Sequence, residues 1–269
     1  MKFLFALLIA LMPMLARAQG EGRPIVIGRS YAMHSAILGD TRRINVYLPP
    51  HYGDPARRFP VLVLLDGGEA EDFHHITGLA QVAAFNGAVE EMIVVGIEGV
   101  DRRHDLTSPS SDPEDRKLAP TQGGAEAYRR FLVDELKPWI ASRYRVSGRT
   151  GLLGESLAGL FTLETYLRAP QSFDDYIAIS PSLWWDKEAL SREAAGDLAK
   201  GGFAGTHLWL SIGGEGATMQ EAMDRIVAEL KADNIGGWTY DPRPSERHDT
   251  IYDPAALAAM RVLFAVKKP

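Results

Sequence analysis

A single serine lies where a predicted strand passes into a predicted helix, a position that suits nucleophilic chemistry. Residues 150–153 form an apolar stretch typical of a buried strand, and residues 156–168 have the apolar spacing of an amphipathic helix. Gly154 and Gly159 flank the junction, where small residues allow the helix to pack closely against the strand. The sharp turn between the two elements lifts the hydroxyl above the edge of a sheet. We therefore predict Ser156 as a nucleophile, with a helix-capping serine as the alternative.

A histidine later in the chain is the candidate base for this serine. A serine hydroxyl is a weak nucleophile and needs a neighbouring base, which comes last in the chain order of such strand-turn-helix sites. Two histidines follow the serine. His207 opens the predicted strand 208–212, which places it at the wrong end of the sheet, whereas His248 lies in the polar loop 245–249. We predict His248 as the base, with a surface histidine of no catalytic role as the alternative.

An acid between the serine and the histidine would hold the imidazole in the required tautomer and orientation. Glu215 comes directly after two glycines that follow the predicted strand 208–212. It should therefore emerge at the same edge of the sheet as Ser156, and we predict it as the acid. The alternative acids are Asp186, which follows the preceding strand, and Glu221 and Asp224, which come a turn or two later.

Backbone N–H groups near the serine are needed to bind the negative charge that develops on an attacked carbonyl oxygen. The N–H of Leu157, directly after the candidate nucleophile, is the first predicted donor. The second is predicted in the loop after the apolar stretch 61–65, where Gly68 lets the backbone approach a substrate closely. The alternative is that Gly67 and Gly68 form an ordinary turn.

The elements that must position these residues alternate between strand and helix along the chain. The predicted strands are 31–35, 42–48, 61–65, 92–96, 150–153, 176–179, 208–212 and 238–240. The clearest predicted helices are 125–142, 156–168, 219–232 and 254–264. This alternation implies parallel strands joined by right-handed crossovers, in a sheet covered on both faces. We predict an α/β fold, a three-layer α/β/α sandwich whose mostly parallel sheet begins with an antiparallel N-terminal hairpin.

One long stretch, residues 98–122, predicts neither a strand nor a helix. It is rich in Asp, Arg, Ser and Pro. A loop of this length in a compact domain more often has a function than serves only as a connection. Arg102 and Arg103 in this stretch are candidate contacts for an anionic ligand, although the acidic residues of the same stretch weigh against one.

The first 18 residues predict a secretion signal rather than part of a domain. Lys2 precedes a run of roughly 13 apolar residues, which is short of the ~20 that a membrane-spanning helix requires. The small residues Ala16 and Ala18 suit a signal peptidase, and a membrane anchor is the alternative. We expect residues 1–18 to be removed and residues 19–269 to form a single domain in the periplasm or outside the cell.

The composition of the mature chain excludes several kinds of site and argues against one class of partner. The sequence contains no cysteine, which excludes disulfides, thiolate metal sites and a lipid-anchored cysteine at the cleavage point. Removing Lys2 and Arg17 from the 29 basic residues leaves 27 against 35 acidic ones, a net charge of −8. An acidic surface argues against nucleic acid as a partner, because such binding depends on neutralising phosphates. No stable membrane insertion is expected after signal removal, no metal or cofactor is implied, and the oligomeric state is left open.

Several segments resemble the putative-esterase branch of the α/β-hydrolases, which includes ferric-siderophore esterases, S-formylglutathione hydrolases and bacterial mycolyltransferases. The resemblance spans most of the mature chain and lies in residues 43–49, 60–67, 105–109, 154–159, 180–185 and 246–254. Ser-Pro-Ser-Leu-Trp-Trp at 180–185 is the most specific segment and is most similar to the siderophore-esterase subgroup. The resemblance supports Ser156 and His248, and it supports Glu215 through the stretch 213–215.

Two positions depart from the pattern of this branch. Glu155 stands where relatives usually carry histidine, and Ala158 replaces the expected glycine. We expect these changes to alter the substrate preference or the geometry of the turn. Some siderophore-cleaving relatives also work with a serine and a histidine alone, which leaves the role of any particular acid open.

The resemblance implies a serine esterase with the α/β-hydrolase fold. Ser156 would attack an ester carbonyl, His248 would remove and return a proton, and water would hydrolyse the acyl-enzyme. A siderophore trilactone is the implied substrate, held as an anionic aromatic ligand by Arg102, Arg103, Trp184 and Trp185. The alternative for the tryptophan pair is a place in the core. The rival functions are an acyltransferase with the same residues and a catalytically inactive binding protein that keeps the fold.

Overall fold

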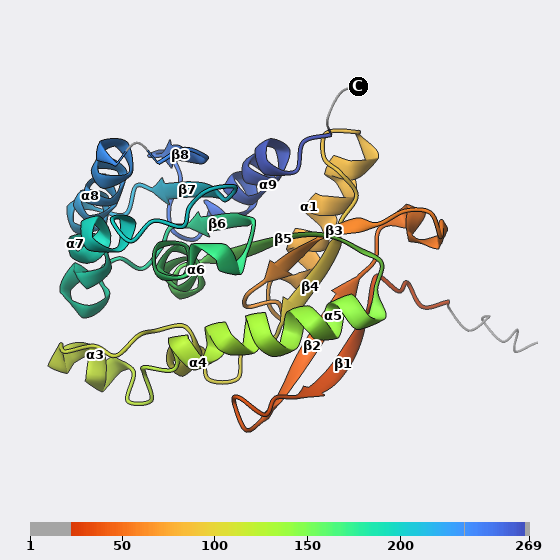
Figure 1. Ribbon diagram of the computed structural model, residues 1–269, viewed down its shortest axis with the longest axis horizontal. Coiled ribbons are helices and arrows are strands. Elements are labelled where there is room, and N and C mark those ends of the chain that lie inside the picture. Colours follow the sequence, from red (N-terminus) through yellow and green to blue (C-terminus); the bar gives the residue numbers. More distant parts are fainter. Residues whose placement is uncertain (1–22, 234, 267–269) are drawn as a thin grey trace, which may run out of the picture.

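A sheet of eight strands forms the centre of the computed structural model, which describes residues 23–233 and 235–266 (Figure 1). In chain order the strands are β1 (Gly28–His34), β2 (Thr41–Tyr47), β3 (Phe59–Leu64), β4 (Ile93–Ile97), β5 (Val146–Glu155), β6 (Asp175–Ile179), β7 (His207–Gly213) and β8 (Trp238–Arg243). Across the sheet the order is β1-β2-β4-β3-β5-β6-β7-β8. The first two strands form an antiparallel hairpin and β2 is antiparallel to β4, whereas all the remaining neighbours are parallel. The predicted mostly parallel sheet with an antiparallel N-terminal hairpin is confirmed.

Helices cover both faces of this sheet, so the chain forms three layers. The longer helices are α1 (Phe73–Phe85), α4 (Ala125–Arg130), α5 (Lys137–Arg143), α6 (Leu157–Arg168), α7 (Trp185–Leu198), α8 (Ala217–Ala232) and α9 (Tyr252–Leu263). Alternate side chains of β3 enter two separate cores: Val61 and Val63 pack in the core under α4 to α8, whereas Leu62 and Leu64 pack under α1 and α9. In Figure 1 the α4–α5 helix lies below β3 and β5, and α9 lies above β5. Burial on both faces of the sheet explains why β3 is apolar at every position.

The predicted helix at 125–142 is one continuous helix with a wider turn in its middle. Residues Phe131–Leu136 form a π-helical turn between α4 and α5, and the N–H of Lys137 donates to the carbonyl of Leu132, five residues back. Pro138 follows directly. A proline lacks the N–H of a regular helix and its ring collides with the carbonyl four residues back, so the wider turn lets the helix continue past it.

The stretch 98–122 is more ordered than its sequence predicts. It contains the short helices α2 (Arg102–Asp105) and α3 (Pro113–Leu118), each preceded by an aspartate whose side chain accepts a backbone N–H. The expectation of an irregular stretch is therefore wrong in part. The stretch is fixed to β2 by a buried ion pair between Arg42 and Asp105, both 3% exposed. Breaking such a pair on one side costs about 3–5 kcal/mol, so this contact fixes α2 and the arginines that begin it.

Two of the longer helices, α1 and α7, are absent from the clearest predictions. The α1 sequence carries two adjacent histidines and a glycine, which obscure the helical spacing. In α7 the second to fourth residues, Asp186, Lys187 and Glu188, have positive φ angles of 47°, 53° and 66°, so its right-handed helical turns begin only after them. The predicted signal peptide, residues 1–18, lies outside the described residues. Within the described ranges, no helix has both the length and the apolar character needed to cross a bilayer.

Candidate active site

Ser156 occupies a strained turn between β5 and α6, at the carboxyl edge of the parallel strands. Its φ angle is 61° and its ψ angle −120°, a conformation that costs a residue with a side chain of order 1–3 kcal/mol. The surrounding backbone holds it in place: its N–H donates to the carbonyl of Ile179 at 3.0 Å, and its carbonyl accepts the N–H of Ser182 at 3.0 Å. Strain of this kind, fixed by neighbouring hydrogen bonds, is typical of a nucleophile at a strand-to-helix turn.

The small residues around the turn are required by close backbone approach. A Cβ atom at Gly154 would lie 2.3 Å from the carbonyl oxygen of Ala158, and one at Gly159 would lie 2.5 Å from that of Ile179. Ala158, the departure from the usual pattern, is fully buried, and its own Cβ is accommodated because Gly154 opposite has no side chain. The extra methyl group therefore leaves the turn intact.

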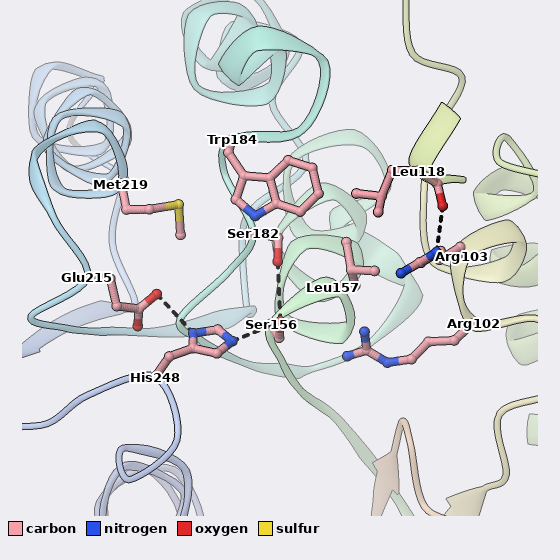
Figure 2. A pocket seen from close by; sticks show the side chains of 10 residues that line it. All are labelled: Arg102, Arg103, Leu118, Ser156, Leu157, Ser182, Trp184, Glu215, Met219 and His248. Carbon is pink, nitrogen blue, oxygen red and sulfur yellow. Dashed lines mark hydrogen bonds and ion pairs between the residues drawn. The ribbon is translucent and has the colours of Figure 1, made fainter. Parts of the chain in front are cut away.

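The structure brings together the three residues predicted as nucleophile, base and acid (Figure 2). Nε2 of His248 lies 3.0 Å from Oγ of Ser156, and Nδ1 of the same ring lies 2.9 Å from Oε2 of Glu215. His248 comes from the loop between β8 and α9, and Glu215 from the loop after β7. Three loops at one edge of the sheet thus form a continuous chain of contacts that can remove a proton from the serine and stabilise the resulting imidazolium.

Glu215 is held by a second residue that the sequence reasoning did not identify. The hydroxyl of Ser180, at the end of β6, donates to Oε1 of Glu215. Burial acts to raise the pKa of Glu215, but the hydrogen bonds from His248 and Ser180 and the charge of the imidazole outweigh it, so the net direction is downward. The carboxylate therefore stays ionised and oriented. Ser180 lies in the segment 180–185, which is the most specific part of the resemblance, and this could have pointed to it.

The segment 180–185 contributes to the site from several of its positions. Besides Ser180, it places Oγ of Ser182 3.3 Å from Oγ of Ser156, and it places Trp184 on the wall of the pocket. Trp185 points elsewhere: it is 5% exposed, and its Nε1 donates to the carbonyl of Ser108 at 2.9 Å. The expectation that Trp185 contacts a substrate is therefore corrected, since its ring packs in the core.

His248 has two carboxylate neighbours. The hydrogen bond that His248 donates to Glu215 is the largest influence and raises the pKa of His248; partial burial opposes this, and the charge of Glu155 adds to it. Oε1 of Glu155 lies 3.2 Å from Nε2, the nitrogen that also faces the serine. Burial raises the pKa of Glu155 to about 7. Glu155, one of the two departures noted in the sequence, is thus in direct contact with the candidate base.

The two predicted N–H donors differ in their availability. Leu157 is the first residue of α6, and the first N–H groups of a helix have no partner within the helix. The N–H of Gly68 is occupied, because it donates to Oε2 of Glu71 at 2.7 Å. The glutamate three residues later folds back over the loop, where its carboxylate also accepts the N–H of Gly99 at 3.3 Å. The prediction that Gly68 offers an open donor is corrected for this conformation.

An open pocket of about 340 Å³ lies over the serine (Figure 2). Its lining residues are Arg102, Arg103, Leu118, Ser156, Leu157, Ser182, Trp184, Glu215, Met219 and His248. Both predicted arginines are among them. The guanidinium of Arg102 pairs with Asp66 at 2.7 Å, whereas Arg103 is exposed and donates to the carbonyl of Leu118. Among the described residues no carboxylate pairs with Arg103, which leaves its charge available to a ligand.

The alternative base and acids lie away from the serine or make other contacts. His207 begins β7, at the opposite edge of the sheet, with Nδ1 3.4 Å from Asp175. The carboxylate of Asp186 accepts the N–H of Ser111 at 2.8 Å. Glu221 and Asp224 are exposed on α8. Glu215 is therefore the carboxylate among the four candidates that contacts His248.

Comparison with known proteins places the chain among esterases. The family model described as "Putative esterase" matches residues 35–232. The ferri-bacillibactin esterase BesA of Bacillus subtilis (strain 168) is 32% identical over 165 residues, which are 55% of this chain and 56% of that protein. The siderophore enterobactin esterase of Emericella nidulans is 36% identical over 102 residues, which are 35% of this chain and 34% of that protein. The chain thus spans about half, or less, of the length of these relatives.

Solved structures show the same fold. An IroE-like serine hydrolase from Shewanella oneidensis superposes with a TM-score of 0.81 and 24% identity, covering 89% of this chain and 82% of that one. The siderophore hydrolase EstA from Aspergillus nidulans superposes with a TM-score of 0.73 and 23% identity, covering 98% of both chains. At these identities the likeness supports the fold, and the site of this chain has to be argued from its own residues.

Proposed function

This chain belongs to the putative esterase family, and from that premise we propose that it is a serine carboxylic-ester hydrolase that works through an acyl-enzyme. The observation that carries the proposal is the contact chain from Ser156 through His248 to Glu215, at 3.0 and 2.9 Å. Such a chain supplies what a serine hydroxyl lacks: a base within hydrogen-bond reach and an acid that orients the base.

We assign a part to each residue in the acylation step. Oγ of Ser156 attacks the ester carbonyl while Nε2 of His248 takes its proton. The lowered pKa of Glu215 keeps this carboxylate charged, so it stabilises the imidazolium and holds Nδ1–H in place. The imidazolium then donates its proton to the departing alkoxide, which leaves as the alcohol. The acyl group stays on the serine.

Hydrolysis of the acyl-enzyme uses the same groups in reverse. A water molecule replaces the alcohol, and its oxygen attacks the acyl carbon while His248 takes a proton from it. The imidazolium then returns this proton to Oγ of Ser156 as the carbon–oxygen bond to the serine breaks, which releases the acid. The N–H of Leu157 binds the carbonyl oxygen in both steps. Gly68 can act as the second donor only when the carboxylate of Glu71 turns away from it, because the two are hydrogen bonded in the structure.

The substrate class we propose is a siderophore-type ester or lactone. Two relatives are siderophore esterases by name, and the pocket carries features that suit an anionic ligand with aromatic groups. Arg103 offers an exposed positive charge, and the exposed ring of Trp184 offers a surface for stacking. Leu118, Leu157 and Met219 add apolar walls. Arg102 contributes less charge to a ligand because Asp66 already pairs with it.

Hydrolysis of a short p-nitrophenyl ester and labelling by a fluorophosphonate probe test the proposed chemistry. We expect labelling of the wild-type chain, and no labelling or turnover above background for Ser156→Ala. Ser30→Ala, which removes an exposed serine of β1, is the matched control and should behave as the wild type. A wild-type protein that is folded but neither labelled nor active would overturn the proposal in favour of a binding protein. Product analysis with added alcohols separates hydrolysis from acyl transfer.

A substrate screen tests the proposed class. The chain would be assayed on short acyl esters, thioesters and catecholate trilactones. We expect the trilactones to give the highest kcat/KM, and we expect Arg103→Gln to raise KM for them roughly tenfold, the loss of one charge-assisted contact. Arg116→Gln, an exposed arginine of α3 outside the pocket, is the control. The assignment would be contradicted if the wild type turned over neutral acyl esters as well as trilactones and Arg103→Gln left both activities unchanged.

We also propose that the protein is exported, on the sequence of residues 1–18. Fractionation of cells that express the full chain should recover it from the periplasm or the medium, shortened by these residues. Replacing the apolar run with polar residues should retain the chain in the cytoplasm at full length. Recovery of the unchanged wild-type chain from the membrane fraction would instead indicate an anchor.

A further inference from the structure

Glu155 and Ser156 compete for the same nitrogen of one imidazole. Oε1 of Glu155 lies 3.2 Å from Nε2 of His248, and Oγ of Ser156 lies 3.0 Å from it. The Glu155 side chain is only 20% exposed, and Oε1 is buried and accepts no hydrogen bond from residues 23–233 or 235–266. Because Glu155 ends β5, the strand that presents the serine also fixes this carboxylate.

The groups around Glu155 leave the imidazole as its main counter-charge. The titratable groups that face it are His248, Arg102, Glu215, Asp72 and Tyr252. Burial is the largest influence and raises the pKa of Glu155 to about 7. The two cations favour the ionised carboxylate, and the two other carboxylates oppose it. Since Arg102 is already paired with Asp66, His248 is the cation that an ionised Glu155 can neutralise.

The protonation of Nε2 decides whether the serine can react. In the reactive state Nε2 carries a lone pair that accepts the hydroxyl proton of Ser156. A carboxylate 3.2 Å away favours the state in which Nε2 carries a proton, and an imidazolium cannot act as a base. The same carboxylate favours the imidazolium that forms when the serine attacks. Glu155 therefore acts on both the resting site and the transition state.

We propose that Glu155 is a positioning residue for the base: its carboxylate holds His248 as imidazolium in the resting site and stabilises the imidazolium that forms during acyl transfer. The inference rests on the proposed function, because it assigns the base that activates Ser156. It differs from the assignment of Glu215, which faces the other nitrogen and leaves Nε2 open to the serine.

Removing the charge of Glu155 has different consequences at the two ends of the pH range. At acidic pH Glu155 is itself protonated in the wild type, since its pKa is about 7, so Ser156 of Glu155→Gln reacts at close to the wild-type rate. At alkaline pH the imidazole is already neutral, and the variant lacks a charge that stabilises the imidazolium of the transition state, so Ser156 reacts more slowly. The two pH profiles therefore converge at acidic pH and separate at alkaline pH. A merely structural defect lowers the rate at both ends and gives no convergence.

The experiment measures the rate at which a fluorophosphonate labels Ser156 between about pH 5 and pH 9 in the full chain. We expect Glu155→Gln to be labelled at close to the wild-type rate near pH 5 and several-fold more slowly near pH 9. Glu69→Gln, which removes an exposed carboxylate from the loop before α1, is the matched control and should follow the wild type. In parallel, NMR titration of His248 should give a lower pKa in Glu155→Gln than in the wild type.

The outcomes separate the two proposals. Labelling of the wild type with parallel profiles for wild type and Glu155→Gln, and an unchanged pKa of His248 by NMR, would overturn this inference and leave the proposed function intact. No labelling of the folded wild type at any pH would overturn the proposed function itself. Profiles that converge at acidic pH and separate at alkaline pH, with a lowered pKa of His248 in Glu155→Gln, would support both.

Discussion

Glu155 and Glu215 are two buried carboxylates that contact the same imidazole, yet their ionisation is shifted in opposite directions. Glu215 lies 2.9 Å from Nδ1 of His248 and also accepts the hydroxyl of Ser180, and its pKa is lowered. Glu155 lies 3.2 Å from Nε2, its buried Oε1 accepts no hydrogen bond within the described part of the chain, and its pKa is raised to about 7. Burial acts upward on both pKa values, so the hydrogen bonds decide the net direction.

The comparison shows that proximity to a histidine does not by itself define the role of a carboxylate. In the reactive tautomer Nδ1 carries the proton and Nε2 does not. A carboxylate at Nδ1 is therefore compatible with a neutral base, and one at Nε2 opposes it. Glu215 and Glu155 are expected to differ in the size of their effect on turnover and in its dependence on pH.

Among the substitutions that test the contrast between Glu215 and Glu155, Glu215→Gln should cause the largest loss of activity. The amide cannot hold His248 in the reactive tautomer or stabilise the imidazolium, so kcat/KM for a p-nitrophenyl ester should fall roughly 10³- to 10⁴-fold. Steady-state kinetics near pH 8 measures this loss. Glu155→Gln should lose far less at the same pH.

The controls for this prediction are the other carboxylates considered for the role of acid. Asp186→Asn and Glu221→Gln should keep near wild-type turnover, since Asp186 binds Ser111 and Glu221 is exposed on α8. Glu215→Gln with more than a tenth of the wild-type activity would show that a serine and a histidine suffice, and the contrast between the two carboxylates would then disappear.

A smaller effect is expected from Ser180→Ala, which removes the hydrogen bond that distinguishes Glu215 from Glu155. Without it the carboxylate loses one of the two groups that orient it, so kcat should fall about tenfold while KM stays close to the wild-type value. Kinetics on the same ester measures the split. Ser191→Ala, a buried serine of α7 whose hydroxyl contacts Glu188 and Arg225, is the matched control. An equal loss in both variants would make Ser180 a packing residue.

The strand and the helix that carry the site were predictable, because reactive residue types lie next to segments with regular apolar spacing. The strand and helix around Ser156 have clear apolar spacing, and the two glycines at the turn are required by approaches of 2.3 and 2.5 Å. His248 and Glu215 followed from chain order and from the edge at which parallel strands end. The roles assigned to the three residues remain predictions, but their mutual contact follows from the fold.

Features that depend on contacts between distant segments could not be predicted in the same way. The N–H of Gly68 is covered by a side chain three residues later, and Trp185 packs inward whereas its neighbour Trp184 faces the pocket. No local pattern separates two adjacent tryptophans. The Ser180 contact joins residues 35 positions apart, so the sequence marked its segment as specific without giving the reason.

The smallest expected effect is a shift in the acid limb of the pH profile. The base must be neutral to accept the proton of Ser156, and the pKa of His248 is raised above its ordinary value of 6.5, first by the hydrogen bond that it donates to Glu215. Wild-type activity should therefore fall as the pH drops through a midpoint above 6.5. In Glu215→Gln the main cause of the raised pKa is gone, so the residual activity should have its midpoint at a lower pH. Profiles of kcat/KM report these midpoints for the free enzyme, and a midpoint that stays unchanged in Glu215→Gln would mean that Glu155 alone sets the protonation of the imidazole.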